Sequence, residues 1–402
     1  MRRTAVSRAV VAAPHESDEP ATVRESPALQ PPPGNPRFPL VDPLRAVAIL
    51  LVVMYHAAAT AGVSTTHVLP QIARQGFVGV MVFFGISGFL IYRPFVAARE
   101  AGRKATPLHR FWRRRALRIL PAYWAALTAL AAFGAVNDVL TRRGPAYYLF
   151  GQIYNARTFS NGIPVAWSLC VEMSFYLLLP AYAWLVARAG ARWARAETVG
   201  IALLLAGGLL WRAVVHIGWV PGVWASALPG MVVFFAVGMG LAALSVRTVG
   251  REEHFAVTRF VRRFPDLCWA GALTAYVVAA TVFSVQAYSA VARSWSSWYG
   301  NYILCVVGAA LLLAPAIIGQ DGGGISRRLL RNPVFAWIGL VSYGIFLWHL
   351  PLMIKFHERG VHSALALLAL TIVVSTVVAA VSYYVLELPL LRLKEPRRQR
   401  SA

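Results

Sequence analysis

Negative charge and cysteine are both scarce in this 402-residue chain. It has 16 Asp and Glu against 39 Lys and Arg, and charged residues of both signs make up only 14% of it, whereas a soluble domain carries about a quarter. Its three cysteines have no paired spacing, which argues against a disulfide framework and a zinc site: Cys170, Cys268 and Cys305. We therefore expect neither an ordinary soluble domain nor a bound metal.

Long apolar runs are what the chain has in abundance, since 58% of its residues are hydrophobic. From Asp42 onward these residues form runs of about 18 to 25, the length that a helix needs to cross about 30 Å of hydrocarbon. There are ten runs, at roughly 42–62, 76–96, 117–136, 165–187, 198–217, 228–246, 267–286, 300–318, 335–355 and 362–386. The sequence predicts an all-α integral membrane protein with ten transmembrane helices and both termini on one side.

The distribution of basic residues orients these spans. Residues 1–40 contain eight prolines and no apolar run, so we expect a disordered cytoplasmic tail, then a membrane domain over 41–390 and a basic cytoplasmic tail over 391–402. This assignment puts 29 of the 39 Lys and Arg in cytoplasmic segments and 6 in outside loops, a strong positive-inside pattern. The net charge of +23 therefore reflects topology in a multi-pass plasma-membrane protein, and nucleic-acid binding is disfavoured.

The first span carries ionisable side chains, which cost a few kcal/mol in a membrane unless they face a cavity or a partner. Asp42 lies at its start, and the eleven residues from Arg45 to His56 bring these two to within about 20° of one helix face, roughly 16 Å apart along the axis. This suits a long anionic substrate that passes Arg45 and presents its reactive end to His56. Alternatively, Arg45 snorkels and His56 is hydrogen-bonded in the core.

Three arginines stand at the mouth of the third span: Arg114, Arg115 and Arg118. Arg114 and Arg118 are four apart and share a helix face, with Arg115 beside them. No acid lies nearby in the sequence, so lipid phosphates or a polyanionic ligand must neutralise them. A simple positive-inside anchor for the span is the alternative, and the spacing does not decide between the two.

The fourth span places Glu172 a turn or two inside its outer end, where a carboxylate needs a positive or hydrogen-bonding partner. Ser168 lies four residues before Glu172 on the same face. Trp167 precedes Ser168 and fits either this polar group or an interfacial aromatic belt. The fourth span therefore carries the third group of polar residues, after those of the first and third spans.

The ninth span carries Ser342 and His349 seven residues apart on one face, with Tyr343 beside them. A lone histidine is more often structural than functional. His56, Glu172 and His349 are too few and too scattered to indicate a metal site. At the end of the tenth span, a helix-end ion pair with a basic neighbour explains Glu387, the partner being Arg392 or Lys394.

Five of these segments resemble, in order, the motifs of the membrane acyltransferase-3 family of multi-span O-acyltransferases. They are VDPLRAVAILLVVMYHA, GFVGVMVFFGISGFLIYRPF, FWRRRALRILPAYW, AWSLCVEMSFYLLLP and SYGIFLWHLPLM, within residues 40 to 390. The resemblance implies ten helices with cytoplasmic termini and acyl transfer from acyl-CoA to a hydroxyl. One departure is Phe346, where relatives often carry tyrosine.

The resemblance also assigns roles to residues of this sequence. It implies that His56 is the essential catalytic residue, Arg45 its partner on the same helix, and Arg114, Arg115 and Arg118 the cytoplasmic arginine motif. It matches Glu172 to the glutamate of the span-four motif, and Tyr343 and His349 to the span-nine motif. These assignments make all of them, with Asp42, Trp167 and Ser168, the candidate site residues.

The residue types fit acyl transfer, which needs a base for the hydroxyl and stabilisation of the developing oxyanion. His56 serves either as that base or as a transient acyl carrier, and the sequence does not separate the two routes. The arginines would hold the phosphates of acyl-CoA, which is a substrate, and we expect no permanently bound cofactor. The acceptor is a hydroxyl of a glycan, a lipid or a secondary metabolite. The alternative function is a transporter or flippase for a lipid-linked sugar or small metabolite.

Overall fold

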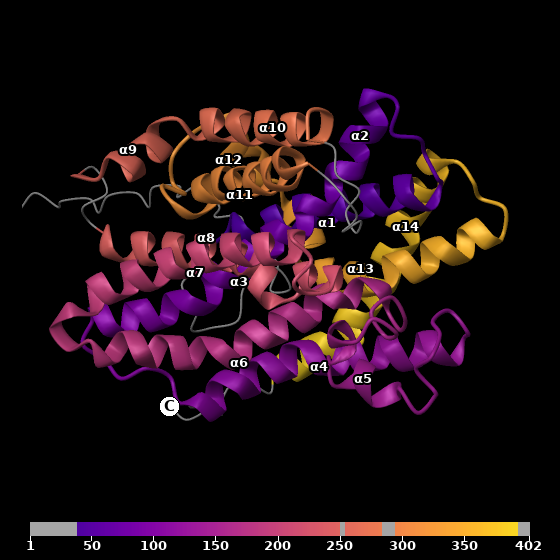
Figure 1. Cartoon of the computed structure of the whole chain (residues 1–402), viewed down its shortest axis with the longest axis horizontal. Coiled ribbons are helices and arrows are strands. Elements are labelled where there is room, and N and C mark those ends of the chain that lie inside the picture. Colours follow the sequence, from indigo (N-terminus) through magenta and orange to yellow (C-terminus); the bar gives the residue numbers. More distant parts are fainter. Residues whose placement is uncertain (1–37, 250–253, 284–293, 393–402) are drawn as a thin grey trace, which may run out of the picture. The chain divides into compact units, whose positions relative to one another are not determined.

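The computed structural model describes residues 38–249, 254–283 and 294–392, and every regular element in these ranges is a helix (Figure 1). The long helices are α1 (Val41–Thr60), α3 (Val78–Glu100), α4 (Leu108–Ala132), α6 (Trp167–Arg188), α7 (Trp193–His216), α8 (Leu228–Arg247), α10 (Pro265–Thr281), α11 (Trp295–Ile317), α13 (Pro333–Glu358) and α14 (Ala364–Ser382). Shorter helices are α2 (Val68–Arg74), α5 (Gly144–Tyr148), α9 (Ala256–Arg263), α12 (Ile325–Leu330) and α15 (Leu388–Arg392). The prediction of an all-helical fold is confirmed.

Eight segments of the described chain are helical, long and apolar enough to cross a membrane. They are Val41–Thr60, Val68–Glu100, Pro164–Arg188, Gly190–His216, Gly222–Arg247, Trp295–Ile317, Pro333–Glu358 and Ala364–Leu391. Each overlaps one of the ten predicted spans. The other two predictions, 117–136 and 267–286, fall on α4, whose first eleven residues include five arginines, and on α10, which has 17 residues. The protein is thus a membrane protein with eight candidate spans in its described part.

The predicted tails fall almost wholly outside the described residues. The structure begins at Phe38 and its first helix at Val41, while α15 ends at Arg392. Of the predicted N-terminal tail only residues 38–40 are described, and of the basic tail only 391 and 392. The division into a membrane domain and two tails therefore remains a prediction.

Two closely packed helix pairs position the polar residues, α3 with α8 and α1 with α13. A Cβ on Gly238 of α8 would lie 2.0 Å from the carbonyl oxygen of Gly85 on α3. A Cβ on Gly339 of α13 would similarly lie 1.8 Å from the carbonyl oxygen of Asp42 on α1. Small residues allow such close backbone contact between membrane helices, where packing rather than hydrophobic burial drives association. Glycine at these positions therefore sets the spacing of the helices that carry the polar residues.

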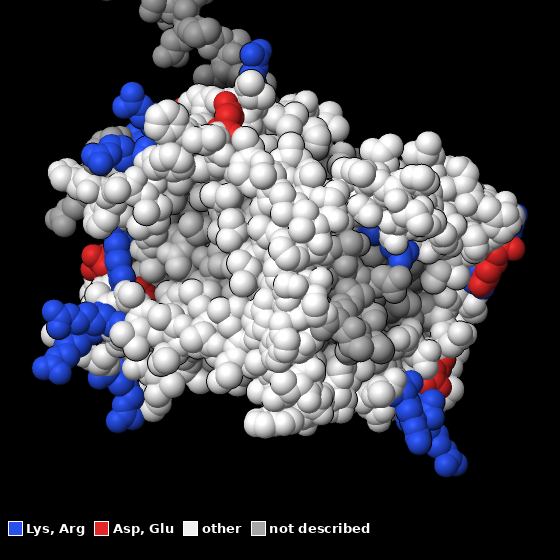
Figure 2. Space-filling view, turned by 45° about the horizontal axis from the view of Figure 1, so that its top comes forward, with Lys and Arg blue, Asp and Glu red and all other residues white. Residues whose placement is uncertain are grey.

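A buried ionic cluster joins α3, α7 and α8 at one end. Glu197 is fully buried and accepts hydrogen bonds from the Tyr92 hydroxyl at 2.6 Å, from Arg99 Nη2 at 2.7 Å and from Arg247. Two guanidiniums thus neutralise one carboxylate, which allows these charges to be buried. Figure 2 shows Lys and Arg toward the ends of one face of the molecule, with a broad uncharged band between them. This pattern suits a protein whose middle faces lipid.

Candidate active site

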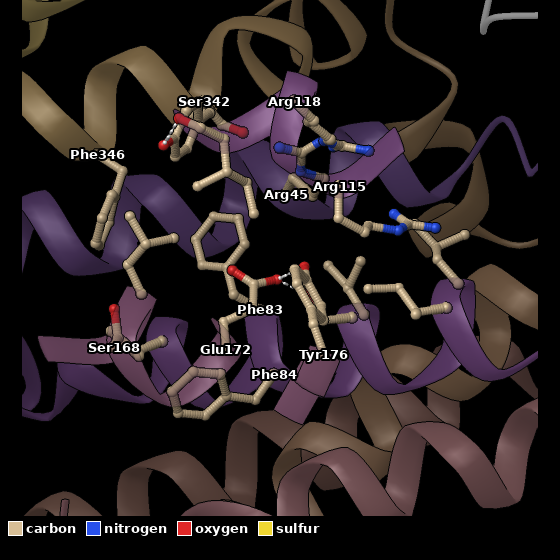
Figure 3. A pocket seen from close by; sticks show the side chains of 18 residues that line it. Arg45, Phe83, Phe84, Arg115, Arg118, Ser168, Glu172, Tyr176, Ser342 and Phe346 are labelled. Atoms are coloured by element: carbon tan, nitrogen blue, oxygen red, sulfur yellow. Dashed lines mark hydrogen bonds between the residues drawn. The ribbon is translucent and has the colours of Figure 1, made fainter. Parts of the chain in front are cut away.

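A cavity of about 90 Å³ lies among α1, α3, α4, α6 and α13 (Figure 3). Its lining combines basic, acidic, hydroxyl and aromatic side chains: Arg45, Val80, Phe83, Phe84, Ile86, Ser87, Leu90, Ile91, Arg115, Arg118, Ile119, Ser168, Leu169, Glu172, Tyr176, Ser342, Tyr343 and Phe346. Polar groups from five helices thus converge inside a membrane protein, where such groups mark substrate paths and reaction centres.

The cavity gathers arginines from two helices that are far apart in the sequence. Arg45 comes from α1, and Arg115 and Arg118 come from α4 (Figure 3). Arg114 is exposed and is not among the lining residues. The sequence predicted that Arg114 and Arg118 share a face, whereas the two arginines of α4 that face the cavity are Arg115 and Arg118. In the described chain, Arg115 Nε is buried without a hydrogen-bond partner. The cavity therefore holds three cations and an unused donor.

Asp42 and Glu172 provide nearby negative charge. Arg45 Nη1 donates to Asp42 Oδ1 at 3.4 Å, but the Asp42 side chain is 40% exposed and lies outside the cavity lining. The charge of Arg45 also interacts with those of Arg118 and Glu172. Since a carboxylate 40% exposed to solvent is a weak counter-charge, Asp42 offsets the charge of Arg45 only in part.

Glu172 points into the cavity and is held by two hydroxyl groups. Ser87 on α3 and Tyr176, one turn further along α6, both donate to Glu172 Oε1. Hydrogen bonds to an ionised acceptor are stronger than neutral ones, so this pair of donors fixes the carboxylate in the cavity wall. Figure 3 shows Glu172 and Tyr176 facing the side of the cavity where the arginines lie. The predicted partner of Glu172 is thus a set of hydroxyls together with the charge of Arg45.

His56 and His349 meet between α1 and α13. His349 Nε2 lies 3.2 Å from His56 Nδ1, and the ring centroids are 5.0 Å apart. His56 is 9% exposed and His349 is fully buried. Because Gly339 approaches Asp42 near the start of these helices and the histidines meet further along, α1 and α13 run parallel. This arrangement joins two predicted candidate residues from the first and ninth spans.

The histidine pair lies just beyond the cavity. Arg45 lines the cavity, whereas His56 and His349 are not among its lining residues. Phe346 does line it, and its ring centroid is 6.3 Å from that of His349. Figure 3 shows Phe346 at the side of the cavity away from Arg115 and Arg118. Phe346 therefore belongs to the cavity wall and is also a neighbour of His349.

The remaining candidates are near the cavity but are largely engaged by the fold. Ser168 and Ser342 line it while donating to backbone carbonyls, at 3.1 Å and 2.7 Å. Tyr343 also lines it and donates to the carbonyl of Ile119 at 2.9 Å, which fastens α13 to α4. Trp167 is 5% exposed and packs against Phe84, so it is buried rather than part of an interfacial belt.

Glu387 reaches the arginines from the C-terminal side. It lies on a short π-helix, Tyr383–Glu387, and is 9% exposed, and its charge interacts with those of Arg118 and Arg45. π-Helical turns often occur at functional sites. The ion pairs predicted for it, with Arg392 or Lys394, fall outside the side chains that the structure describes. Among the described residues, no three His, Cys, Asp or Glu side chains form a metal-binding group.

Sequence reasoning missed Ser87, Tyr176 and Phe83, all of which line the cavity. Tyr176 follows Glu172 by four residues, a spacing that places both on one helix face and therefore provided a signal. Ser87 lies in a run of glycine and apolar residues on a different helix. Its contact with Glu172 depends on how α3 packs against α6, which no local pattern reveals.

Comparison with known proteins identifies the family. The model described as "Acyltransferase domain" matches residues 39–385, which is most of the chain. The chain therefore belongs to the acyltransferase-3 family, as its motifs predicted, and it is a membrane protein of an acyltransferase class.

Several curated proteins are similar to this chain over most of its length. The peptidoglycan O-acetyltransferase of Listeria monocytogenes is 25% identical over 342 residues, covering 78% of this chain and 49% of the relative. A putative peptidoglycan O-acetyltransferase of Bacillus subtilis is 25% identical, with coverage of 88% and 55%, and an O-acetyltransferase of Staphylococcus aureus is 24% identical, with coverage of 89% and 58%. The chain thus spans about half the length of these relatives. No solved structure matches it.

Proposed function

We propose that this protein is an integral-membrane O-acyltransferase that moves an acetyl or other short acyl group from acyl-CoA to a hydroxyl. The observation that carries this proposal is the convergence of Arg45, Arg115 and Arg118 on one cavity next to the His56–His349 pair. An acyl-CoA has phosphates at one end and a thioester at the other. Guanidiniums bind phosphates through paired hydrogen bonds, and an imidazole provides a base or a nucleophile for the thioester chemistry.

In this proposal the three arginines hold the phosphates at the cytoplasmic mouth. Arg115 contributes the buried Nε that lacks a partner among the described residues. The neutral pantetheine arm extends past Glu172 toward Phe346, whose movement admits the thioester to His56. The 90 Å³ cavity is too small for the whole donor, so a change of side-chain positions accompanies binding.

His56 acts at the thioester by one of two routes. As a general base it takes the acceptor's hydroxyl proton while that oxygen attacks the carbonyl carbon, and it then gives the proton to the departing sulfur. As a nucleophile it takes the acyl group from the thioester and passes it to the acceptor, which allows donor and acceptor to use opposite membrane faces. Exclusion of water protects the thioester from hydrolysis in both routes.

The proposed topology has ten transmembrane helices with both termini in the cytoplasm. The eight candidate spans support eight of them, and α4 and α10 supply the third and seventh. Arg115 and Arg118 of α4 face the cavity rather than lipid. This orientation lowers the free-energy cost of inserting α4 into the membrane. The N-terminal tail over 1–40 and the basic tail over 391–402 then lie on the donor's side.

The acceptor proposed first is a cell-wall glycan, because two of the relatives are named for peptidoglycan. Lipid and secondary-metabolite hydroxyls are the other classes. The decisive experiment supplies purified protein in lipid nanodiscs with acetyl-CoA and soluble peptidoglycan fragments, and follows free thiol and acetylated product. Acceptor-dependent thiol release that is lost in His56→Ala supports the enzyme.

The control for that experiment is His357→Ala, a change at the far end of α13 and outside the cavity lining. It should behave like the wild type. Movement of a solute across the membrane by a protein that never releases thiol would instead support a transporter or flippase. Equal thiol release by the His56→Ala and wild-type proteins would remove His56 from the mechanism.

A further inference from the structure

His349 is held in one protonation form by its own helix. Its Nδ1 lies 3.0 Å from the carbonyl oxygen of Ile345 and 2.9 Å from that of Phe346. Carbonyl oxygens only accept hydrogen bonds, so Nδ1 must carry the proton. In the neutral ring the other nitrogen, Nε2, then has a free lone pair. The side chain is fully buried.

His56 has the complementary arrangement. Its Nδ1 lies 2.9 Å from the carbonyl oxygen of Val52 and 3.2 Å from His349 Nε2, and both of these are acceptors. The proton of neutral His56 therefore sits on Nδ1 and is shared between them. It follows that His56 Nε2 is the unprotonated nitrogen. This is the atom that the proposed chemistry needs, whether it takes a proton or an acyl group.

We infer that His349 is the positioning residue for His56, with the role that a carboxylate fills in a Ser-His-Asp triad. The inference rests on the proposed function. The His349 lone pair orients the His56 ring across the interface between α1 and α13. It also accepts a stronger, charge-assisted hydrogen bond when His56 becomes positively charged.

The proton balance of the base route is simple. The acceptor's O–H proton moves to His56 Nε2 as the new C–O bond forms, and the same proton moves to sulfur as the C–S bond breaks. The Nδ1 proton stays between His56 and His349 throughout, so His349 stabilises the intermediate imidazolium without touching the substrate. In the nucleophilic route the bond from Nε2 to the carbonyl carbon forms as the C–S bond breaks, and coenzyme A leaves as a thiolate that takes a proton from water. The acceptor oxygen then takes the acyl group as the N–C bond breaks and gives its own proton to water, while the Nδ1 contact holds the charged acyl-imidazolium between the two steps.

No carboxylate in the described chain lies within hydrogen-bond distance of His56. His349, from α13, is the titratable group whose charge acts on it, and the Tyr55 ring from its own helix lies 4.7 Å away. A neutral imidazole partner favours the charged form of His56 less than a carboxylate would. A carboxylate introduced at position 349 should therefore move the acidic limb of the pH–rate profile to higher pH.

The test compares His349→Leu, His349→Gln and His349→Glu with the wild type, using the thiol-release assay in nanodiscs with acetyl-CoA and soluble peptidoglycan fragments. Leucine removes the nitrogen that accepts the hydrogen bond from His56, so kcat should fall about 100-fold while KM for acetyl-CoA stays within about threefold. Glutamine offers a carbonyl oxygen to His56 Nδ1, so kcat of His349→Gln should be at least tenfold higher than kcat of His349→Leu. Glutamate should shift the acidic limb upward in pH.

The control is His357→Leu, which removes a half-buried histidine near the C-terminal end of the same helix, outside the cavity lining, and should leave kcat unchanged. Melting temperature in nanodiscs identifies any variant that fails to fold, and in that case the glutamine variant and its pH profile carry the test. Loss of activity in His56→Ala with wild-type kcat in the folded His349 variants would overturn this inference alone. Equal losses with leucine and glutamine, with no pH shift for glutamate, would show a purely structural role. A wild-type protein without thiol turnover would overturn the proposed function itself.

Discussion

Replacing Arg118 with glutamine should weaken the binding of coenzyme A without affecting the binding of its neutral arm. Arg118 lines the cavity beside Arg45 and Arg115. A hydrogen bond to a charged partner contributes about 1.5–3 kcal/mol. Loss of one guanidinium–phosphate contact should therefore raise the Kd for coenzyme A about 10- to 150-fold.

The assay is calorimetric titration of the protein in nanodiscs with coenzyme A and, separately, with pantetheine, which has the same thiol arm without phosphates. Arg118→Gln should bind pantetheine as the wild type does. Arg113→Gln is the matched control, because Arg113 is an exposed arginine on the same helix and is not among the cavity-lining residues. An equal loss for both ligands, or an unchanged Kd for coenzyme A, would refute phosphate binding by this cavity.

Three further predictions concern other parts of the molecule. Phe346→Ala should widen the inner end of the cavity and raise the rate with octanoyl-CoA relative to acetyl-CoA; an unchanged ratio would exclude Phe346 as a limit on acyl length. Glu197→Ala leaves two partly buried guanidiniums without a carboxylate and should destabilise the fold by about 3 kcal/mol or less, because solvent screens part of their charge, and a melting temperature equal to that of the wild type would contradict a stabilising role of the cluster. Hydrogen bonds from Arg143, Tyr147 and Thr141 lower the pKa of Asp138 below its ordinary 3.8, despite the opposing effect of desolvation. The contacts of Asp138 should thus stabilise its loop above about pH 4, and this stabilisation should be lost as the pH falls through the lowered pKa. Amide protection factors over residues 138–147 that stay constant below pH 4 would count against this.

The sequence predicted the spans well because a bilayer imposes length and apolarity on each helix separately. Runs such as 42–62 and 335–355 need no partner to be recognised, and α1 and α13 lie over them. Two helices are not among the eight candidate spans. The first turns of α4 are rich in arginine, and α10 is short. Local composition therefore predicts where each helix lies along the chain.

The arrangement between helices was much less accessible. Helical spacing grouped Arg114 with Arg118, yet Arg115 faces the cavity and Arg114 is exposed, because packing against α13 and the π-helix sets the rotation of α4. His56 and His349 were each singled out, but nothing local indicated that their rings meet. That contact depends on the close approach of α1 and α13 at Gly339.

The most direct test of the central claim is transfer of a radiolabelled acetyl group from acetyl-CoA to soluble peptidoglycan fragments by the wild-type and His56→Ala proteins in nanodiscs. Labelled fragments and stoichiometric free thiol are expected with the wild type, and neither above background with His56→Ala, while both proteins bind coenzyme A equally. Labelled fragments at the wild-type rate from the His56→Ala protein would contradict the central claim.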